Sequence, residues 1–416
     1  MGTSPCMRLL TAALAACALV LLAAPGAGAA TGVKFGIQDD AWLLHGAGTL
    51  EDRLDRLERL GVDIVRFNLH WNTIEPTRGT QDWQAADEVL NGLRAHGISA
   101  VVGLVGSPRW ANGGRTPNYA PAGTSFGAFA RAAATRYRWV TRWLVWNEPN
   151  QARWLRPTTP AVYVRQILNP AYAAIHAANP RAKVAGGVTA PRGSSAGVSP
   201  VAWIRGMKAA RARLDVYAHH PYPSTTRETP FSGGCAHCTT ITMATLDRLL
   251  TEVGRAFGPK RIWLTEYGYQ TGSFGVSQQR QAELIGQSAL RVYRAPRVDI
   301  LIHYLVKDEP KSARFQSGLY DSAGRAKLAA LAFPLPIAQA GRSGGKLVLW
   351  GQVRPRSGAQ TYRVQVRTGG AWRFSGGTRR TSPRGFFSAA VAAPVGASIR
   401  IFSPRDRAYS AAIRVR

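Results

Sequence analysis

The stretch WLVWNEPN, residues 143–150, begins as an apolar, aromatic run and ends in an amide and a carboxylate, Asn147 and Glu148. Pro149 follows at once, and proline both lacks a backbone N–H and disfavours helix at the residue before it. The run is therefore typical of a buried β-strand that stops abruptly. Its last side chains are then directed at whatever lies beyond the strand end.

Seven further runs have the same character: short, largely apolar and rich in β-branched residues. They are VKFGIQ (33–38), DIVRFNLHW (63–71), SAVVGLV (99–105), AKVAGGVT (182–189), LDVYAHHPY (214–222), RIWLTEYGY (261–269) and DILIHYLV (299–306). Continuous apolar runs indicate parallel strands buried on both faces. Amphipathic segments lie between them and end at glycine, as TLEDRLDRLERLG does at Gly61.

Eight strands, each followed by a helix, predict an α/β fold of the (β/α)8 TIM-barrel type. An open doubly wound sheet is the alternative, but the dinucleotide fingerprint and the phosphate-binding P-loop are both missing from the sequence. Beyond LPIAQAGRSGG (335–345) the pattern changes to short strand-like runs separated by turn residues. This predicts a small C-terminal all-β, sandwich-like domain at 343–416 after a barrel at 31–338.

The first thirty residues have the pattern of an export signal. Arg8 precedes an apolar stretch, and small residues around Ala29 and Ala30 form a cleavage zone. We therefore predict a cleaved signal peptide at 1–30 and a secreted or cell-envelope protein. Lipid attachment at Cys17, in LAAC, is the alternative. No later stretch is long and apolar enough to span a bilayer.

Two cysteines, Cys235 and Cys238 in GGCAHCTT, remain after removal of that segment. In an oxidising compartment they predict a local disulfide. A zinc site would need more ligands than His237 adds, because no second Cys/His pair follows at suitable spacing. We therefore expect neither a metal nor a cofactor.

The formal net charge of +30 raises the question of anionic partners. The basic residues are mostly scattered arginines, and no nucleic-acid-binding signature accompanies them, which argues against a specific nucleic-acid partner. The C-terminal segment 343–416 is very basic, with Asp406 its only acidic residue. An anionic cell-surface polymer bound through this domain stays open.

Barrel enzymes place their chemistry where the strands end. Two carboxylates emerge there, Glu148 after the fourth strand and Glu266 at the end of the seventh, so they are expected to face each other across the barrel mouth. Paired carboxylates suit glycosidic cleavage, in which one is protonated and the other ionised. Arg66, Trp110 and Tyr304 lie at or after other strand ends.

WNEPN and the later LTEYGY resemble the signature of the clan A glycoside hydrolases, which are retaining (β/α)8 enzymes. VRFNLHWNTIEPTRGTQDW, GSPRWANGG, WNEPNQARWLRP, DVYAHHPYP and SGLYDSAGRAKLAALAF are similar to stretches of family 39 glycoside hydrolases and their bacterial exopolysaccharide-cleaving relatives. The resemblance spans the barrel and none of the C-terminal domain. It implies a hydrolase of β-linked polysaccharide or oligosaccharide.

The resemblance also implies roles. Glu148 would be the general acid/base and Glu266 the nucleophile, while Asn147 would hydrogen-bond the sugar 2-hydroxyl. Arg66 would keep Glu266 ionised by charge and hydrogen bonding.

The sixth strand ends in His219, His220 and Tyr222. Because successive strand residues point to opposite faces, His220 shares its direction with Tyr222, and we expect both to point inward. The resemblance implies that one of these two contacts Glu266.

Trp110 and Trp154 are candidate sugar platforms, because the apolar face of a pyranose packs on an aromatic ring. Many clan members carry a tryptophan at the end of the eighth strand. Here that place holds His303 and Tyr304, so the floor of the sugar subsite departs from the family pattern.

Two rival functions remain at this point. One is a non-catalytic carbohydrate- or anionic-surface-binding protein that kept the glycosidase scaffold without turnover. The other is an anionic-polymer-binding protein whose function lies in residues 343–416. The presence of both glutamates argues against loss of turnover.

Overall fold

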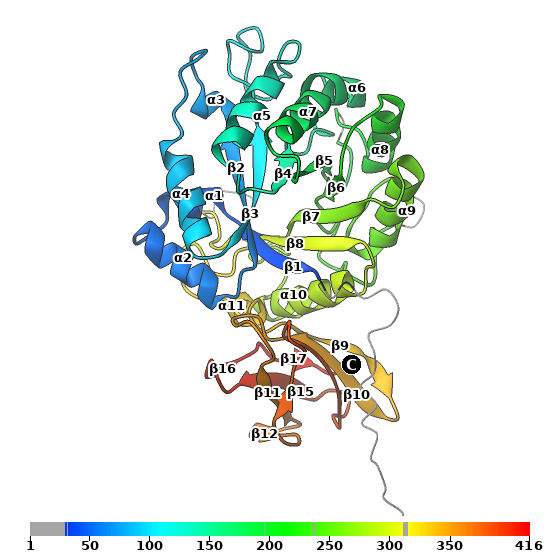
Figure 1. Cartoon of the computed structure of the whole chain (residues 1–416). Coiled ribbons are helices and arrows are strands. Elements are labelled where there is room, and N and C mark those ends of the chain that lie inside the picture. Colours follow the sequence, from blue (N-terminus) through cyan, green and yellow to red (C-terminus); the bar gives the residue numbers. More distant parts are fainter. Residues whose placement is uncertain (1–29, 31, 195, 236–237, 311–314) are drawn as a thin grey trace, which may run out of the picture.

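The computed structural model describes Ala30 and residues 32–194, 196–235, 238–310 and 315–416. The predicted signal peptide therefore lies outside the described residues, apart from Ala30, and so does His237. Figure 1 shows a barrel surrounded by helices, with a smaller β-domain packed below it.

Eight parallel strands close the barrel in chain order, and β1 pairs with β8. The strands are β1 (Lys34–Gln38), β2 (Ile64–His70), β3 (Ser99–Val105), β4 (Arg142–Val145), β5 (Lys183–Thr189), β6 (Val216–His219), β7 (Arg261–Tyr267) and β8 (Val298–Tyr304). Six of the eight apolar runs contain a whole strand, and β4 and β8 each begin one residue before their run. The predicted (β/α)8 barrel is confirmed.

The barrel interior is filled by alternate strand residues, as the two-residue period requires. Ten of them form one buried apolar cluster: Ile64, Val101, Leu144, Ala185, Val188, Val216, Ala218, Trp263, Ile300 and Ile302. Gly36 is needed where β1 approaches β2, because a Cβ atom there would lie 2.2 Å from the carbonyl oxygen of Ile64. The residues between them face the helices and join the larger outer core.

The helices follow the amphipathic segments. They are α1 (Asp40–His45), α2 (Leu50–Arg59), α3 (Trp71–Ile74), α4 (Gln84–Ala95), α5 (Ser125–Arg136), α6 (Pro160–Val162), the π-helical η1 (Tyr163–Leu168), α7 (Asn169–Ala178), α8 (Pro200–Ala209), the 3-10 turn η2 (Met243–Thr245), α9 (Leu246–Phe257), α10 (Gln278–Tyr293) and α11 (Ala329–Ala332). In α2, Thr49 and Asp52 form a reciprocal capping box, and Gly61 follows the helix with φ of 69°.

The C-terminal region folds as two antiparallel sheets around a core of its own. One contains β9 (Ile337–Ser343), β10 (Lys346–Gln352) and β14 (Phe386–Val391). The other contains β11 (Thr361–Arg367), β12 (Arg373–Phe374), β13 (Arg379–Arg380), β15 (Ser398–Ser403), β16 (Ala408–Tyr409) and β17 (Ile413–Arg414). The predicted all-β domain after the barrel is confirmed.

The start of this domain differs from the prediction. The sequence pattern predicts a start at residue 343. Instead, β9 begins at Ile337 and pairs with β10 on both sides of a register shift at Val348/Leu349. An irregularity of this kind breaks the alternation that would have marked β9 as a strand.

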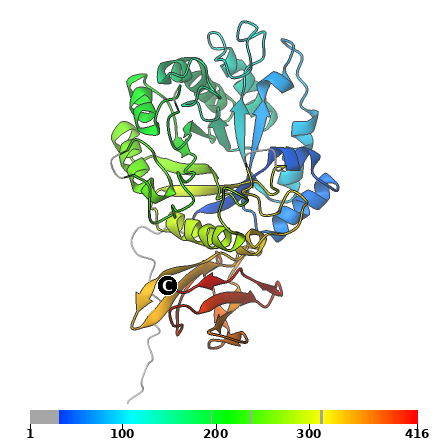
Figure 2. The same cartoon turned by 180° about the vertical axis from the view of Figure 1, so that it is seen from behind.

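The C-terminal domain packs against α10, as both views show (Figures 1 and 2). The Tyr293 ring of α10 lies 5.3 Å from Trp350 and 4.8 Å from Phe386. Arg354 reaches the outer core of the barrel domain, with its guanidinium carbon 3.9 Å from the ring centre of Phe35 and 4.7 Å from that of Phe333. Burial lowers the pKa of Arg354 to about 10.

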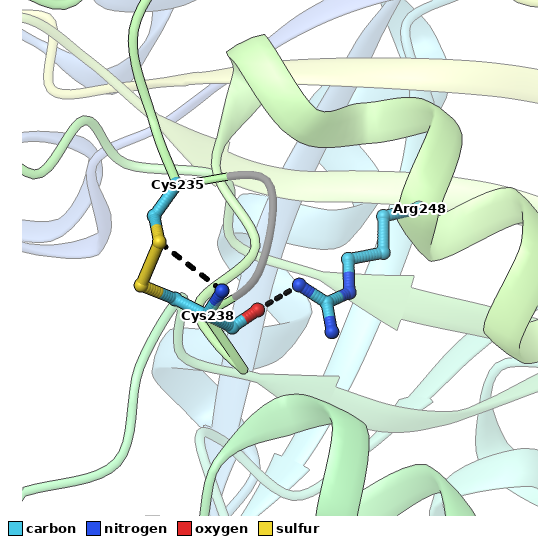
Figure 3. Close-up of a disulfide and its surroundings, with 3 residues drawn as sticks. All are labelled: Cys235, Cys238 and Arg248. Atoms are coloured by element: carbon cyan, nitrogen blue, oxygen red, sulfur yellow. Dashed lines mark hydrogen bonds between the residues drawn. A yellow bond between two sulfur atoms is a disulfide. The ribbon is translucent and has the colours of Figure 1, made fainter.

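The loop after β6 is closed by a disulfide between Cys235 and Cys238, as predicted (Figure 3). The Cys238 amide donates to Cys235 Sγ at 3.1 Å, and Arg248 of α9 donates to the Cys238 carbonyl. The arginine links the short loop to the helix. Within the part of the chain that the structure describes, no helix is long and apolar enough to cross a membrane.

We expect Arg354→Ala to destabilise the protein by about 1–3 kcal/mol, because it removes a half-buried side chain and its contacts with two aromatic rings. Denaturant unfolding followed by circular dichroism measures this. The matched control is Arg356→Ala two residues on, whose exposed ion pair with Asp406 should contribute at most about 1 kcal/mol. Equal stability losses for both variants would contradict the conclusion that the contacts of Arg354 with Phe35 and Phe333 stabilise the protein.

Candidate active site

A cavity of about 2030 Å³ opens at the carboxyl ends of the barrel strands. Residues from all eight strands or the loops that follow them line it; among these residues are Gln38, Arg66, Asn147, Glu148, Arg192, Tyr222, Glu266 and Tyr304. Both predicted carboxylates therefore share one cavity. Its volume is large enough for several sugar rings rather than one.

Arg66 lies at the centre of the site and is completely buried. Its Nη1 donates to Glu266 Oε1 at 2.8 Å and to the Thr265 carbonyl at 3.1 Å. Its Nη2 donates to Asn147 Oδ1 at 2.7 Å. One guanidinium thus fixes groups from β7 and from the end of β4, and it places a permanent positive charge against Glu266.

The two carboxylates approach each other closely. One oxygen of Glu148, one of Glu266 and one ring nitrogen of His220 all lie within 4.8 Å of one another. His220 Nδ1 is 2.9 Å from Glu148 Oε1 and 3.6 Å from Glu266 Oε2. The imidazole therefore stands between the two acids, and His220 points inward as its parity predicted.

The partners of the other ring nitrogen assign the proton of His220. Nε2 lies 3.1 Å from Arg66 Nη1, which only donates, and 3.1 Å from Thr265 Oγ1, which can donate. Nε2 is therefore the acceptor, and the proton is on Nδ1, where it is donated to Glu148 Oε1. Burial lowers the pKa of His220 to about 3, so the ring stays neutral near pH 7.

The surroundings of Glu148 favour its protonated form. Burial raises the pKa of Glu148 to about 7, although the charge of Arg66 and a hydrogen bond from the Trp154 side chain act in the opposite direction. Glu266 differs because it has the direct ion pair with Arg66 and a second hydrogen bond, from the Tyr222 hydroxyl at 3.1 Å. Glu148 is thus suited to hold a proton, whereas Glu266 is paired directly with a permanent cation.

The backbone at the end of β4 is strained where it presents Glu148. Trp146 has φ of 74° and Glu148 has φ of 38°, both in the left-handed region that non-glycine residues seldom adopt. The Trp146 indole donates to the Trp154 carbonyl at 2.8 Å, and its amide donates to the Leu104 carbonyl at 2.9 Å. These bonds hold a turn, followed by Pro149, that aims the carboxylate into the cavity.

Aromatic rings form one wall of the cavity. Tyr304, Tyr222 and Phe315 pack edge to face or tilted, with ring centres 5.0–6.4 Å apart. Tyr304 and Trp154 line the cavity as predicted. His303 points away from it, with Nε2 2.8 Å from the Ser317 carbonyl. Tyr304 therefore occupies the wall where many clan members have a tryptophan.

The structure does not bring Trp110 into this cavity. Its indole donates to the Glu75 carbonyl at 2.9 Å, and its ring packs edge-on against Trp71 at 5.4 Å. Trp110 is absent from the cavity lining, so it is not a sugar platform there. It lies in a loop, where no strand period indicates the direction of a side chain.

Two residues near the end of β1 were missed by the sequence reasoning. Gln38 and Asp40 line the cavity, and Gln38 Oε1 and Asp40 Oδ1 are buried without a hydrogen-bond partner among the described residues. The other oxygen of Asp40 accepts from Asn68 at 2.7 Å. Unpartnered buried acceptors facing a cavity are suited to bind hydroxyl groups. The sequence contained one signal for them. Gln38 and Asp40 lie two and four residues after Gly36, which faces the barrel interior, so the two-residue period of a strand directs them inward as well.

Glu148, His220 and Glu266 also have the spacing of metal ligands. A cation there would lie close to the Arg66 guanidinium, which is 2.8 Å from Glu266 and 3.1 Å from His220. The repulsion between like charges in a buried site makes these residues a poor metal site.

The comparisons with known proteins identify a family. A family model for the glycosyl hydrolase catalytic core matches residues 117–332, which include both Glu148 and Glu266. Among curated proteins, none matches the sequence.

Solved structures share the fold at low sequence identity. A family 39 glycoside hydrolase from Bacteroides cellulosilyticus has 17% identity and a TM-score of 0.60, over 87% of this chain and 80% of that one. A family 39 enzyme from Xanthomonas axonopodis has 15% identity and a TM-score of 0.57, over 88% and 93%. A monomeric β-xylosidase from Caulobacter crescentus has 15% identity and a TM-score of 0.56, over 90% and 96%.

The matched region of the family model spans more than half of the 416 residues and runs from before β4 to the last helix of the barrel. It contains the strand ends that supply both carboxylates. The chain therefore belongs to the glycosyl hydrolase catalytic core family and is a glycoside hydrolase.

Proposed function

We propose that this glycoside hydrolase cleaves β-linked, equatorial glycosidic bonds of a polysaccharide or oligosaccharide with retention of configuration. Glu266 is the nucleophile and Glu148 the acid/base. The observation that carries the proposal is the close approach of the two carboxylates, with one oxygen of each within 4.8 Å. That spacing fits retaining enzymes, at about 5–5.5 Å, better than inverting ones, at roughly 6.5–9.5 Å.

The reaction proceeds by double displacement. Glu266 attacks the anomeric carbon while the glycosidic C–O bond breaks and Glu148 gives its proton to the leaving oxygen. Glu148, now ionised, takes a proton from water, which attacks the glycosyl-enzyme and releases Glu266. Asn147 donates its amide hydrogens to the sugar 2-hydroxyl, because its oxygen already accepts from Arg66.

The difference between the two carboxyl groups supports these roles. Glu266 is ion-paired with Arg66 and so is available as a nucleophile. Glu148 accepts the His220 Nδ1 proton on Oε1, which leaves Oε2 for the catalytic proton. A protein that only binds carbohydrate, the alternative left open by the sequence, would have no need for two carboxyls in unlike environments.

The β-linkage and the polymer substrate are supported by the shared fold and by the size of the cavity. The β-xylosidase of Caulobacter crescentus shares the fold, and the cavity of about 2030 Å³ is open to more than one sugar unit. The predicted signal peptide at 1–30 and the Cys235–Cys238 disulfide support a secreted or cell-envelope enzyme. Attachment through Cys17 stays the alternative.

We expect Glu148→Ala and Glu266→Gln each to lower hydrolysis of aryl β-glycosides with poor leaving groups by about 10³-fold or more. With an activated aryl glycoside, azide should restore the activity of Glu148→Ala and yield a glycosyl azide of retained configuration. Azide attacks the anomeric carbon of the glycosyl-enzyme from the face opposite the bond to Glu266. Product NMR identifies the anomer. Glu88→Gln, an exposed position on α4, is the control.

An azide product of inverted configuration from Glu148→Ala would contradict its role as acid/base. A wild-type enzyme that releases the inverted anomer first would contradict the retaining mechanism.

We expect kcat/KM of the wild type to fall as pH rises through about 7. Burial raises the pKa of Glu148 to about 7, and above this pH Glu148 loses the proton that the leaving oxygen requires. A pH series with a poor leaving group measures the decline. The high-pH decline should disappear in Glu148→Ala assayed with an activated leaving group, and its persistence there would assign the decline to another residue.

We expect Asp40→Ala to lower kcat/KM by about 10- to 100-fold, because it removes an acceptor that faces the cavity without a protein partner. Asp40→Asn, which retains one acceptor oxygen, should lose less. Steady-state kinetics measure both effects, and thermal unfolding verifies that the barrel is intact. Unchanged kinetics in a folded Asp40→Ala would exclude a role in sugar binding.

A further inference from the structure

The outer face of the larger C-terminal sheet carries a concentration of arginines and aromatic rings. In β11 and β15, Tyr362, Val364, Ile399 and Ile401 point into the core of the domain. The alternate residues therefore point outward. We call the outward set the arginine–aromatic face, and it consists of Arg363, Arg367, Trp372, Phe374, Arg400, Phe402 and Tyr409.

Arginines and rings alternate across this face at contact distance. The guanidinium carbon of Arg363 lies 3.4 Å from the Phe374 ring centre. Those of Arg367 and Arg400 lie 4.8 and 4.3 Å from the centre of Trp372. Stacking of this kind orients a guanidinium against a ring. The Nε of Arg363 is buried, so a ligand could reach this side chain only through its Nη groups.

A second row completes the face. The Arg400 carbon lies 4.0 Å from the Tyr409 ring centre, and that ring packs against Phe402 at 4.7 Å. Arg400 Nε also donates to Gln365 Oε1 at 2.8 Å. Arg400 is thus fixed between two rings and an amide, in contrast to a mobile surface arginine.

The positive charge of this face is not balanced by nearby acids. Asp406, the only acidic residue of 343–416, is paired with Arg356 at 3.4 Å and accepts from Ser403 at 2.7 Å. No ion pair among the described residues includes Arg363, Arg367 or Arg400. Three oriented guanidinium groups are therefore left for an anionic partner.

We propose that the arginine–aromatic face binds a carboxylate-bearing polysaccharide of the uronic acid type. A guanidinium edge matches a carboxylate with two parallel hydrogen bonds, and partly exposed rings such as Trp372 and Tyr409 offer surface to the apolar face of a pyranose. The choice of a polysaccharide over a nucleic acid or a membrane rests on the proposed function, because the barrel of the same chain acts on carbohydrate.

The face is separate from the catalytic cavity. Figures 1 and 2 show β12 at the end of the molecule far from the barrel, and none of the seven residues of the face lines the cavity. Binding at this face would keep the enzyme on a polymer and raise the local concentration of cleavable bonds. It would not change the turnover of a small glycoside.

The test measures binding of the full-length chain to polygalacturonate by affinity electrophoresis at about 150 mM salt, with neutral dextran as reference. Two variants address the face: Arg363→Gln/Arg367→Gln/Arg400→Gln, and Trp372→Ala, which leaves the charge unchanged. The matched control, Arg131→Gln/Arg138→Gln/Arg181→Gln, removes the same charge from exposed positions on the barrel.

We expect the triple face variant to weaken binding at least about tenfold, Trp372→Ala to weaken it measurably, and the barrel control to bind like wild type. Thermal unfolding verifies that each variant is folded. If the triple face variant and the barrel control lost equal amounts of polygalacturonate binding, the binding would depend on net charge alone, and the proposal would be wrong. Tighter binding of single-stranded DNA or phosphatidylglycerol vesicles through the face would also overturn it.

The outcome is independent of catalysis. Glu266→Gln should bind polygalacturonate like the wild type, since the nucleophile is far from the face. If the protein binds polygalacturonate but does not hydrolyse glycosides, the proposed function of the cavity is wrong. If it hydrolyses glycosides but does not bind polygalacturonate, the proposed function of the arginine–aromatic face is wrong.

Discussion

The active site depends on one buried positive charge. Arg66 is withdrawn from water completely, and the free-energy cost of burying an unpaired cation in this way is several kcal/mol. The site compensates it with the Glu266 carboxylate at 2.8 Å and with oxygens from Thr265 and Asn147. These acceptors come from β7 and from the end of β4. The hydrogen bonds of Arg66 therefore also fix the positions of two strand ends on opposite sides of the barrel mouth.

The same guanidinium differentiates the two glutamates. Glu266 touches it, whereas Glu148 touches His220, a ring that burial keeps neutral near pH 7. Direct ion pairing stabilises a carboxylate, and burial beside a neutral partner favours the carboxylic acid. Two chemically identical side chains can thus take opposite roles in one reaction, because only one of them is within hydrogen-bond distance of Arg66.

The strained turn after β4 is what makes this geometry possible. A strand that continued straight would alternate its side chains and would carry Asn147 and Glu148 to opposite faces. Left-handed backbone at Trp146 and Glu148 breaks that alternation, so both side chains enter the cavity. The buried indole of Trp146 and the following Pro149 stabilise the turn, which explains the unusual sequence with which the apolar run ends.

The sequence predicted those parts of the molecule that follow a period. The eight apolar runs, the glycines that end helices, and the inward direction of His220 and Tyr222 all obey strand or helix geometry. Trp110 and β9 did not follow it: the first lies in a loop, and the second contains a register shift opposite Val348. The acceptors Gln38 and Asp40 belong to no recognisable motif, and their position after Gly36 shows only on which side of β1 they lie. That Gln38 Oε1 and Asp40 Oδ1 are buried without a partner appears only in the closed barrel.

The charge within the cavity is distributed unevenly between its two sides. Arg153 and Arg192 line the cavity on the side of Glu148, and both act on its carboxyl group through their charge. Asp40 and Glu309 lie on the side of Tyr304 instead. Because the acid/base stands next to the leaving group, the basic side of the cavity is the one that meets the remainder of the polymer. An anionic group on that remainder would therefore meet Arg153 and Arg192 in the cavity, just as it would meet arginines on the arginine–aromatic face.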